Sequence, residues 1–234
     1  MEITMKIHGL QKLTLLDYPG KVACTVFTGG CNFRCPFCHN AALVLRPTET
    51  ESIALDDFFS FLKKRHGVLD GVCITGGEPM LQDGLSAFAR RIKEEGFLVK
   101  LDTNGSFPEK LKELVSAKLV DYVAMDIKNS KKRYAETIGK KTFDLSGVEE
   151  SVRFLLSDVV PYEFRTTVTR EFHDRESLME AARWIAGCKR YFLQSFTDSG
   201  DLLADSVSGY TKSEMESLAN DVRTVIPQTE LRGV

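Results

Sequence analysis

The stretch VACTVFTGGCNFRCPFC, residues 22–38, joins a predicted strand to a cysteine-rich loop. Its first part, Val22–Thr28, is apolar or β-branched, which is typical of a strand covered on both faces. Two glycines then lead into Cys31, Cys35 and Cys38, three cysteines within eight residues. The sequence therefore predicts a buried strand that delivers three thiols on one tight loop.

Five further segments have strand composition, and stretches with helical periodicity separate them. The expected strands are Gly71–Thr75, Leu98–Thr103, Tyr122–Ile127, Tyr162–Thr169 and Tyr191–Phe196. One expected helix contains Leu85, Phe88, Ala89 and Ile92 and ends at a left-handed cap at Gly96. A second begins after Asp174. Two more begin at capping boxes, Ser146 with Glu149 and Ser213 with Glu216. This alternation predicts right-handed βαβ units and an α/β fold, whose parallel sheet is open or curled into a partial barrel.

No linker divides the chain, so we expect one domain over residues 1–234, with residues 1–21 as an extension leading into the first strand. One long polar connection, Asn129–Phe143, is rich in Lys and Arg. It is a solvated helix and loop, or alternatively a lid or partner-docking surface, since long loops in compact domains often carry function.

The charge balance is almost neutral, with 31 Lys and Arg against 33 Asp and Glu. It lacks the basic footprint expected for bulk binding to nucleic acid or an anionic membrane. The N-terminus lacks the apolar core of a signal peptide, and no stretch reaches the roughly 18 apolar residues that span a bilayer. We therefore expect a cytoplasmic protein with neither nucleic acid nor membrane as a partner.

The cysteines point to a metal centre rather than to disulfides, because the cytosol keeps thiols reduced. Cys24, Cys73 and Cys188 lie in apolar surroundings and are expected to be small buried side chains. The three thiols of the loop can converge on one inorganic centre and leave a coordination position open, whereas most closed cysteine sites need four ligands. The alternative is a zinc site completed by His39 or a distant cysteine, although His39 directly follows Cys38 and no second C-x-x-C pair exists.

The pattern Cys-x3-Cys-x-aromatic-Cys resembles the signature of radical S-adenosylmethionine (SAM) enzymes. The longer string LLDYPGKVACTVFTGGCNFRCPFCHN, residues 15–40, resembles the start of the activating enzymes of glycyl-radical proteins. The resemblance implies a radical SAM partial (β/α)6 barrel with outer helices. It also implies that Cys31, Cys35 and Cys38 hold a [4Fe–4S] cluster whose open iron binds SAM, that Phe37 lies beside the adenine, and that Asn40 lies near the cluster.

Later motifs agree with this family in their order and in their position at strand ends. Gly76-Gly77-Glu78-Pro79 resembles the GGEP motif, which holds the SAM amino group; glycines permit close backbone approach and a carboxylate suits an ammonium. Asp102-Thr103-Asn104-Gly105 and Asp126-Ile127-Lys128 resemble motifs that contact the amino, carboxylate and ribose groups of SAM. From these motifs the resemblance implies cofactor contacts by Asp102, Asn104, Asp126 and Lys128.

The family also suggests a monovalent cation bound by Asp102, Thr103, Asp126 and the carbonyl of Ala124. Arg165 is expected to pair with a carboxylate of SAM or a substrate, or else to form a salt bridge. Where several activating enzymes show Leu-Pro-Tyr-His, this chain has Leu193-Gln194-Ser195-Phe196, so adenosine recognition is expected to use Phe196 and backbone groups. The segment between Cys38 and Gly76 contains only Cys73, which predicts a single cluster.

The resemblance implies an oxidoreductase whose reduced cluster cleaves SAM to a 5′-deoxyadenosyl radical, with no side-chain acid or base needed for that step. Within the family, the chain resembles most the longer form of the activating proteins of anaerobic ribonucleoside-triphosphate reductase. The implied partners are the large subunit of that reductase, which would receive the glycyl radical, and flavodoxin or ferredoxin as electron donor.

Three alternatives stay open at this point. The chain could activate another glycyl-radical enzyme of the formate-lyase or decarboxylase type. It could be a radical SAM enzyme acting on a small molecule. It could also be a non-catalytic protein with zinc in the cysteine loop.

Overall fold

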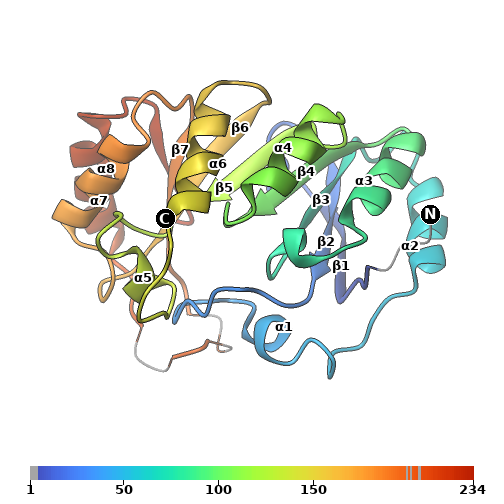
Figure 1. The fold of residues 1–234 in the computed structure, drawn as a ribbon, viewed down its shortest axis with the longest axis horizontal. Coiled ribbons are helices and arrows are strands. Elements are labelled where there is room, and N and C mark those ends of the chain that lie inside the picture. Colours follow the sequence, from blue (N-terminus) through green and yellow to red (C-terminus); the bar gives the residue numbers. More distant parts are fainter. Residues whose placement is uncertain (1–4, 199, 201, 205–206) are drawn as a thin grey trace. The chain divides into compact units, whose positions relative to one another are not determined.

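A computed structural model describes residues 5–198, 200, 202–204 and 207–234. In this part of the chain, an eight-stranded sheet has its strands in chain order from β1 to β8, and helices occupy most of the connections (Figure 1). Strand pairs other than β1 with β2 are parallel wherever their register is defined. The predicted α/β class is confirmed, and the open sheet is consistent with a partial barrel.

The elements follow one another along the chain with connections of different lengths. The strands are β1 (Gly9–Thr14), β2 (Ala23–Thr28), β3 (Gly71–Gly76), β4 (Leu98–Thr103), β5 (Tyr122–Asp126), β6 (Tyr162–Val168), β7 (Tyr191–Ser195) and β8 (Thr229–Arg232). The helices are α1 (Ala41–Leu45), α2 (Leu55–Lys63), the 3-10 helix η1 (Pro79–Leu81), α3 (Leu85–Glu94), α4 (Pro108–Ser116), α5 (Tyr134–Thr137), α6 (Ser146–Leu156), α7 (Arg175–Trp184) and α8 (Lys212–Arg223).

The chain forms two compact units, which we describe separately. The N-terminal unit comprises Met1–Asn32, Ala42–Thr103 and Glu109–Val123. The C-terminal unit comprises Phe33–Ala41, Asn104–Pro108 and Ala124–Val234. The cysteine loop therefore contributes Cys31 to the first unit and Cys35 and Cys38 to the second.

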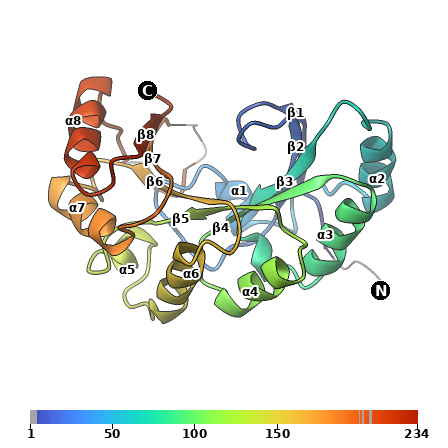
Figure 2. The ribbon, with the colours of Figure 1, turned by 90° about the horizontal axis from the view of Figure 1, so that it is seen from above.

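In the N-terminal unit, β2, β3 and β4 are parallel neighbours, and most of their apolar side chains are buried. Helix α3 packs against β4 through Leu85, Phe88 and Ile92, the periodic face expected from the sequence. Figure 2 shows α2, α3 and α4 along the same side of β3 and β4. Lys110 of α4 donates to the Met80 carbonyl at 3.0 Å, so this layer also contacts the segment that follows β3.

In the C-terminal unit, β6, β7 and β8 are parallel neighbours. Helices α7 and α8 lie side by side, and α8 also packs against β7 and β8 (Figures 1 and 2). The hydroxyl groups of Thr166 and Tyr191 share a buried 2.7 Å hydrogen bond between β6 and β7. The strands of this unit are thus fixed by both backbone pairing and side-chain contacts.

Two strands were not predicted. The N-terminal extension contains β1, which pairs antiparallel with β2, and the end of the chain contains β8 beside β7. Residues 1–21 are therefore more than a lead-in to the first predicted strand, because β1 forms one edge of the sheet.

The ends of the helices agree only in part with the predictions. Asp174 caps α7 in a capping box with Ser177, and Gly96 adopts a φ of 85° after α3, as expected. The box at Ser146 is wrong, because α6 begins at that residue and its N-cap is Leu145. The box at Ser213 is also wrong, since Thr211 with Glu214 caps α8 two residues earlier.

No helix in the described ranges is both long and apolar enough to cross a lipid bilayer.

An ion pair fixes β8 to the rest of the C-terminal unit. Both Nη atoms of Arg232 donate to the fully buried carboxylate of Glu163, at 2.6 and 2.9 Å, and the guanidinium lies 3.4 Å from the centre of the Phe192 ring. This contact joins β8 to β6 across β7.

Replacing Arg232 with Met should lower the free energy of unfolding by about 3 kcal/mol, because it leaves the Glu163 carboxylate buried without its partner. Urea unfolding of the apo-protein measures this loss. The double variant R232M/E163L removes both charges and should recover most of it. A double variant as unstable as R232M alone would contradict this account of the pair.

Candidate SAM and cluster site

The GGEP motif packs directly on the residues that precede the cysteine loop. At the end of β3, the Glu78 N–H donates to the Gly30 carbonyl at 2.8 Å, and the Gly77 N–H donates to the Thr28 carbonyl at 2.9 Å. A Cβ atom at Gly77 would lie 1.9 Å from the Gly30 oxygen, and one at Gly76 would lie 2.3 Å from the Thr28 oxygen. Both glycines are therefore required by close backbone packing inside the N-terminal unit.

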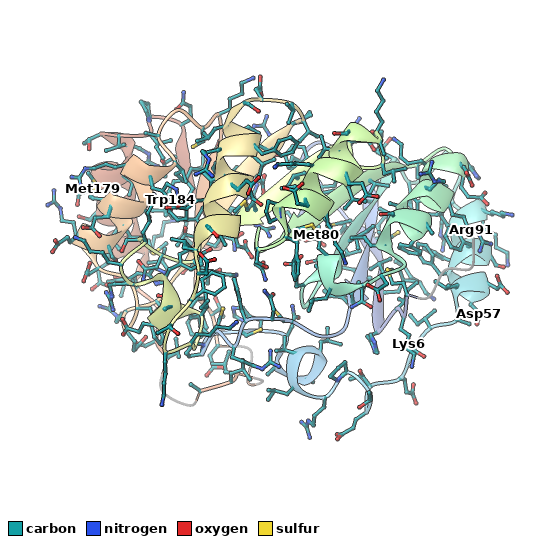
Figure 3. The ribbon with its side chains drawn as sticks, viewed as in Figure 1. Lys6, Asp57, Met80, Arg91, Met179 and Trp184 are labelled. Carbon is teal, nitrogen blue, oxygen red and sulfur yellow. The ribbon has the colours of Figure 1, made fainter. Side chains whose placement is uncertain are left out.

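The carboxylate of Glu78 is completely buried and receives hydrogen bonds from two directions. Its Oε1 accepts from the Met80 N–H at 3.1 Å, which caps the 3-10 helix that begins at Pro79, and from the Thr103 hydroxyl at 2.9 Å. Met80, labelled in Figure 3, is itself fully buried. The structure thus brings together two of the predicted motifs, at the ends of β3 and β4.

Asp102 has a partner that the sequence analysis did not identify. Lys100, two residues earlier on β4, has a side chain that is only 1% exposed and forms an ion pair with Asp102 Oδ1. Cys73 on β3 lies beside both, with its Sγ 3.8 Å from Lys100 Nζ and 3.7 Å from Asp102 Oδ1. The sequence did contain a signal for this pair, a lysine in the middle of the apolar strand LVKLDT. Alternate residues of a strand share one face, so Lys100 and Asp102 point to the same side.

The second half of the cysteine loop is built into the C-terminal unit. The Cys38 N–H donates to the Cys35 carbonyl at 3.0 Å, which closes a tight turn around Pro36 and Phe37. Cys35 and Phe37 are buried, and the Phe37 ring packs on Phe172 and His173 with centroid separations of 5.8 and 6.0 Å. Whether Phe37 also contacts an adenine stays a prediction.

The basic segment Asn129–Phe143 holds this loop in place. The Arg34 N–H donates to the Ile138 carbonyl at 2.9 Å, and the Phe33 ring meets Tyr134 and Phe143 edge-on. Tyr134 and Ile138 are fully buried, and the Tyr134 ring also contacts Trp184. The segment forms α5 and a loop whose Lys131, Lys132 and Lys141 are exposed, as the solvated interpretation expects, but its apolar side chains pack inward.

Asp126 and its neighbours form a charged cluster at the ends of β5 and β6. Arg165 Nε and Lys128 Nζ each lie 3.0 Å from a different oxygen of Asp126, and the three side chains are between 13% and 27% exposed. Burial opposes the charged form of Asp126, but Arg165 and Lys128 outweigh it and lower its pKa to about 2. Of the two interpretations of Arg165, the salt bridge is observed, and a bound carboxylate stays a prediction.

Lys128 links this cluster electrostatically to the cysteine loop. Burial lowers the pKa of Lys128, but Asp126 and then Cys35 raise it above its usual range. The Lys128 ammonium therefore places a positive charge near Cys35. Since the thiolate is the form that binds a metal, this arrangement suits a cluster ligand at Cys35.

The His173 side chain contacts both the ring of Phe37 and the backbone of Lys128. The ring is fully buried, accepts from the Thr169 N–H at its Nδ1 (3.2 Å) and donates from its Nε2 to the Lys128 carbonyl (2.8 Å). Burial lowers the pKa of His173 to about 4, so the ring is neutral at pH 7.

The remaining predicted residues lie at loops of the C-terminal unit. Asn104 Oδ1 accepts from the Ser106 N–H and hydroxyl, at 2.9 and 2.6 Å, so this side chain shapes the turn after β4. The ring of Phe196, after β7, contacts His39 with centroids 5.3 Å apart and ring planes tilted by 33°. Asn40 directly precedes α1. The structure thus places Phe196 beside the residue that follows Cys38, while the cofactor contacts of all three residues stay predictions.

The chemistry of the donor set fits an iron–sulfur cluster. The described cysteines form no disulfide, so the three thiols of the loop are available as ligands. Cys24 and Cys188 are buried as predicted, and burial raises the pKa of each to about 12, which keeps these two thiols protonated. Within the described ranges, no group of three or more His, Cys, Asp or Glu side chains is arranged to hold a metal ion. A cubane differs from a single ion because each thiolate binds its own iron.

Comparison with known proteins now identifies the class. The model of the radical SAM superfamily matches residues 25–156, more than half of the chain and including all three cysteines of the loop. The chain therefore belongs to the radical SAM superfamily, and its cofactors are a [4Fe–4S] cluster and SAM.

Its relatives define the group within the superfamily. A Methanocaldococcus jannaschii protein named as a glycyl-radical enzyme activating enzyme is 36% identical over 198 residues, which cover 81% of this chain and 79% of the relative. Pyruvate formate-lyase-activating enzyme of Listeria monocytogenes is 33% identical over 138 residues, 54% of either chain. The protein is thus a radical SAM activating enzyme of glycyl-radical enzymes.

Solved structures agree with the fold. SuiB of Streptococcus suis bound to SAM superposes with a TM-score of 0.69 at 16% sequence identity. The superposed region covers 87% of this chain and 47% of the SuiB chain. At that identity the likeness concerns the fold alone.

Gly139 provides a test of the contact between the basic segment and the cysteine loop. Its φ is 69°, and a Cβ there would lie 2.2 Å from the Arg34 carbonyl oxygen. Replacing Gly139 with Ala should displace the loop and lower the iron content after anaerobic reconstitution by about half or more. Gly187 is the matched control, because its φ is 93° with no atom near the added Cβ. Equal iron content in G139A and G187A would show that the contact does not hold the loop.

The buried His173 predicts a pH-dependent stability. A lowered pKa in the folded state means that the unfolded chain binds the proton more tightly between about pH 6.5 and 4. The stabilising contribution is thus present above pH 6.5 and is lost as the pH falls towards 4, by up to about 3 kcal/mol. Urea unfolding of the apo-protein across this range should show a smaller loss for His173→Gln than for the wild type. Parallel curves would contradict the prediction.

Proposed function

We propose that this activating enzyme generates a glycyl radical on the large subunit of anaerobic ribonucleoside-triphosphate reductase. The match over 81% of the chain to a glycyl-radical enzyme activating enzyme carries the activase function. The choice of the reductase rests on the resemblance of the motif string over residues 15–40. The match to pyruvate formate-lyase-activating enzyme favours a formate-lyase as the second candidate partner.

In this proposal Cys31, Cys35 and Cys38 hold the cluster, and residues at the strand ends hold SAM. When bound, the reduced cluster and SAM supply a 5′-deoxyadenosyl radical that takes a hydrogen atom from a glycine of the partner. The segment between Cys38 and Gly76 forms α1, α2 and β3, and its one cysteine, Cys73, is buried in β3, which supports a single cluster.

The protein's own residues bind and position the reactants. The GGEP backbone and Glu78 would hold the amino group of SAM, and Asp102 would contact SAM at the end of β4. The Asp126, Lys128 and Arg165 cluster carries two cations for one carboxylate, so it has a net positive charge suited to the SAM carboxylate. Phe37 and Phe196 would contact the adenosine. Asn104 would contact SAM after β4, and Asn40 would lie near the cluster. No described side chain is needed as a general acid or base.

We further propose that residues 1–234 work as one catalytic domain in the cytoplasm and that flavodoxin or ferredoxin supplies the electron. The near-neutral charge of the chain supports a protein partner rather than nucleic acid.

Anaerobic incubation of the reconstituted, reduced enzyme with SAM and the reductase should produce the doublet electron-resonance signal of a glycyl radical. A reductase variant with the accepting glycine replaced by alanine is the control, and a pyruvate formate-lyase is the competing partner. A doublet on the formate-lyase alone would overturn the choice of partner and leave the activase function intact.

Cys35→Ala should lose the cluster, with less than about a tenth of the roughly four irons per chain expected for the wild type. The reason is that two thiolates cannot secure the cubane. Cys188→Ala, at a buried cysteine outside the loop, is the matched control and should keep its iron. Full iron content and SAM cleavage in C35A would contradict the ligand assignment, and a wild-type protein that binds zinc without iron would contradict the enzyme.

A further inference from the structure

Lys100 is buried in a position where a charge has to be compensated. Its side chain is 1% exposed, and the residues on either side of it, Val99 and Leu101, are fully buried. An ammonium without a counter-charge is strongly destabilised in such surroundings. The strand therefore keeps Lys100 only because a carboxylate lies within reach.

The geometry of β4 supplies that carboxylate. Lys100 and Asp102 are two residues apart and therefore share one face of the strand. The ammonium donates to Asp102 Oδ1, and Cys73, which is in register with Lys100 on β3, lies beside the pair. Asp102 is more exposed than its partner, at 14%, so the pair runs from the buried strand to the strand end.

The neighbouring hydroxyl is also engaged. Thr103 Oγ1 donates to the buried Glu78 carboxylate, which in turn caps η1. A cation bound by Asp102 and Thr103 would share the Asp102 carboxylate with the Lys100 ammonium. The bound cation and the ammonium are both positive, and two positive charges on one partly buried carboxylate repel each other strongly. The residues present therefore do not fit a monovalent metal ion at Asp102.

We propose that the Lys100 ammonium provides the positive charge at Asp102, so that this enzyme binds SAM without Na⁺ or K⁺ at that carboxylate. Lys100 acts as a positioning residue that holds Asp102 in one orientation and neutralises it. The inference rests on the proposed role of Asp102 in binding SAM.

The wild-type enzyme gives the first test. The Kd for SAM of the reconstituted enzyme is measured at constant ionic strength in Na⁺, in K⁺ and in tetramethylammonium, which is too large to enter a carboxylate site. The three values should agree within about twofold. Crystals soaked in Rb⁺ should show no anomalous peak at Asp102. A Kd that weakens about tenfold in tetramethylammonium, or a Rb⁺ peak at Asp102, would overturn the proposal.

Lys100→Met gives the second test, because it keeps the length of the side chain and removes the charge. Its Kd for SAM should weaken about tenfold in tetramethylammonium, and K⁺ should restore most of the affinity. Lys93→Met is the matched control. Lys93 pairs with Asp121 at 2.7 Å in the same unit, but at the opposite ends of the strands. Loss of this pair should leave the Kd for SAM unchanged. If K100M binds SAM as the wild type does in every salt, the proposal is wrong.

The double variant K100M/D102N keeps the test decisive if K100M folds poorly, because it leaves no unpaired carboxylate. It should show no dependence on K⁺, whatever its Kd. A K⁺-dependent double variant would overturn the inference, since the cation would then act elsewhere. Absence of SAM binding and cleavage by the wild-type enzyme would instead contradict the proposed function.

Discussion

The contact between the GGEP backbone and the backbone of residues 28–30 is the constraint on which the site depends. Glu78 and Gly77 donate to the carbonyls of Gly30 and Thr28, and neither Gly76 nor Gly77 has room for a side chain. Cys31 follows directly after this contact. The first thiol of the loop is therefore fixed relative to the end of β3 by hydrogen bonds and packing that do not involve the cofactors.

Buried charges form a second layer of organisation at the strand ends. Lys100 pairs with Asp102, Arg165 and Lys128 pair with Asp126, and Arg232 pairs with Glu163. Each pair lies within one of the two units, so each unit satisfies its own buried charges. The consequence is that the orientation of these carboxylates is set before any ligand binds, which lowers the entropic cost of binding.

The sequence predicted six strands well because their apolar runs are long and are bounded by turn residues. It missed β1 and β8 because both are partly polar: Gln11 and Lys12 of β1 are exposed, and β8 is only TELR. The error at α8 has a specific cause. The string Thr211-Lys-Ser-Glu-Met-Glu216 contains two overlapping capping boxes, and the chain uses the first.

The motifs of the site could be located from their order along the chain, but their local partners could not. Lys100 was overlooked because a lysine in a strand is usually solvated, although its apolar neighbours and, in the structure, its register with Cys73 indicate that it faces inward. The buried residues of Asn129–Phe143 were hidden by the high content of basic residues around them. Pairing of side chains from distant parts of the chain is set by tertiary packing, which periodicity does not report.

The packing of the cysteine loop has a consequence for biosynthesis. Residues 33–38 contact Tyr134, Ile138, Phe143, Phe172 and His173, all of which leave the ribosome after the loop itself. The growing polypeptide thus exposes its thiols long before it can shelter them. The loop can therefore reach its final packing only after residue 173 has been synthesised.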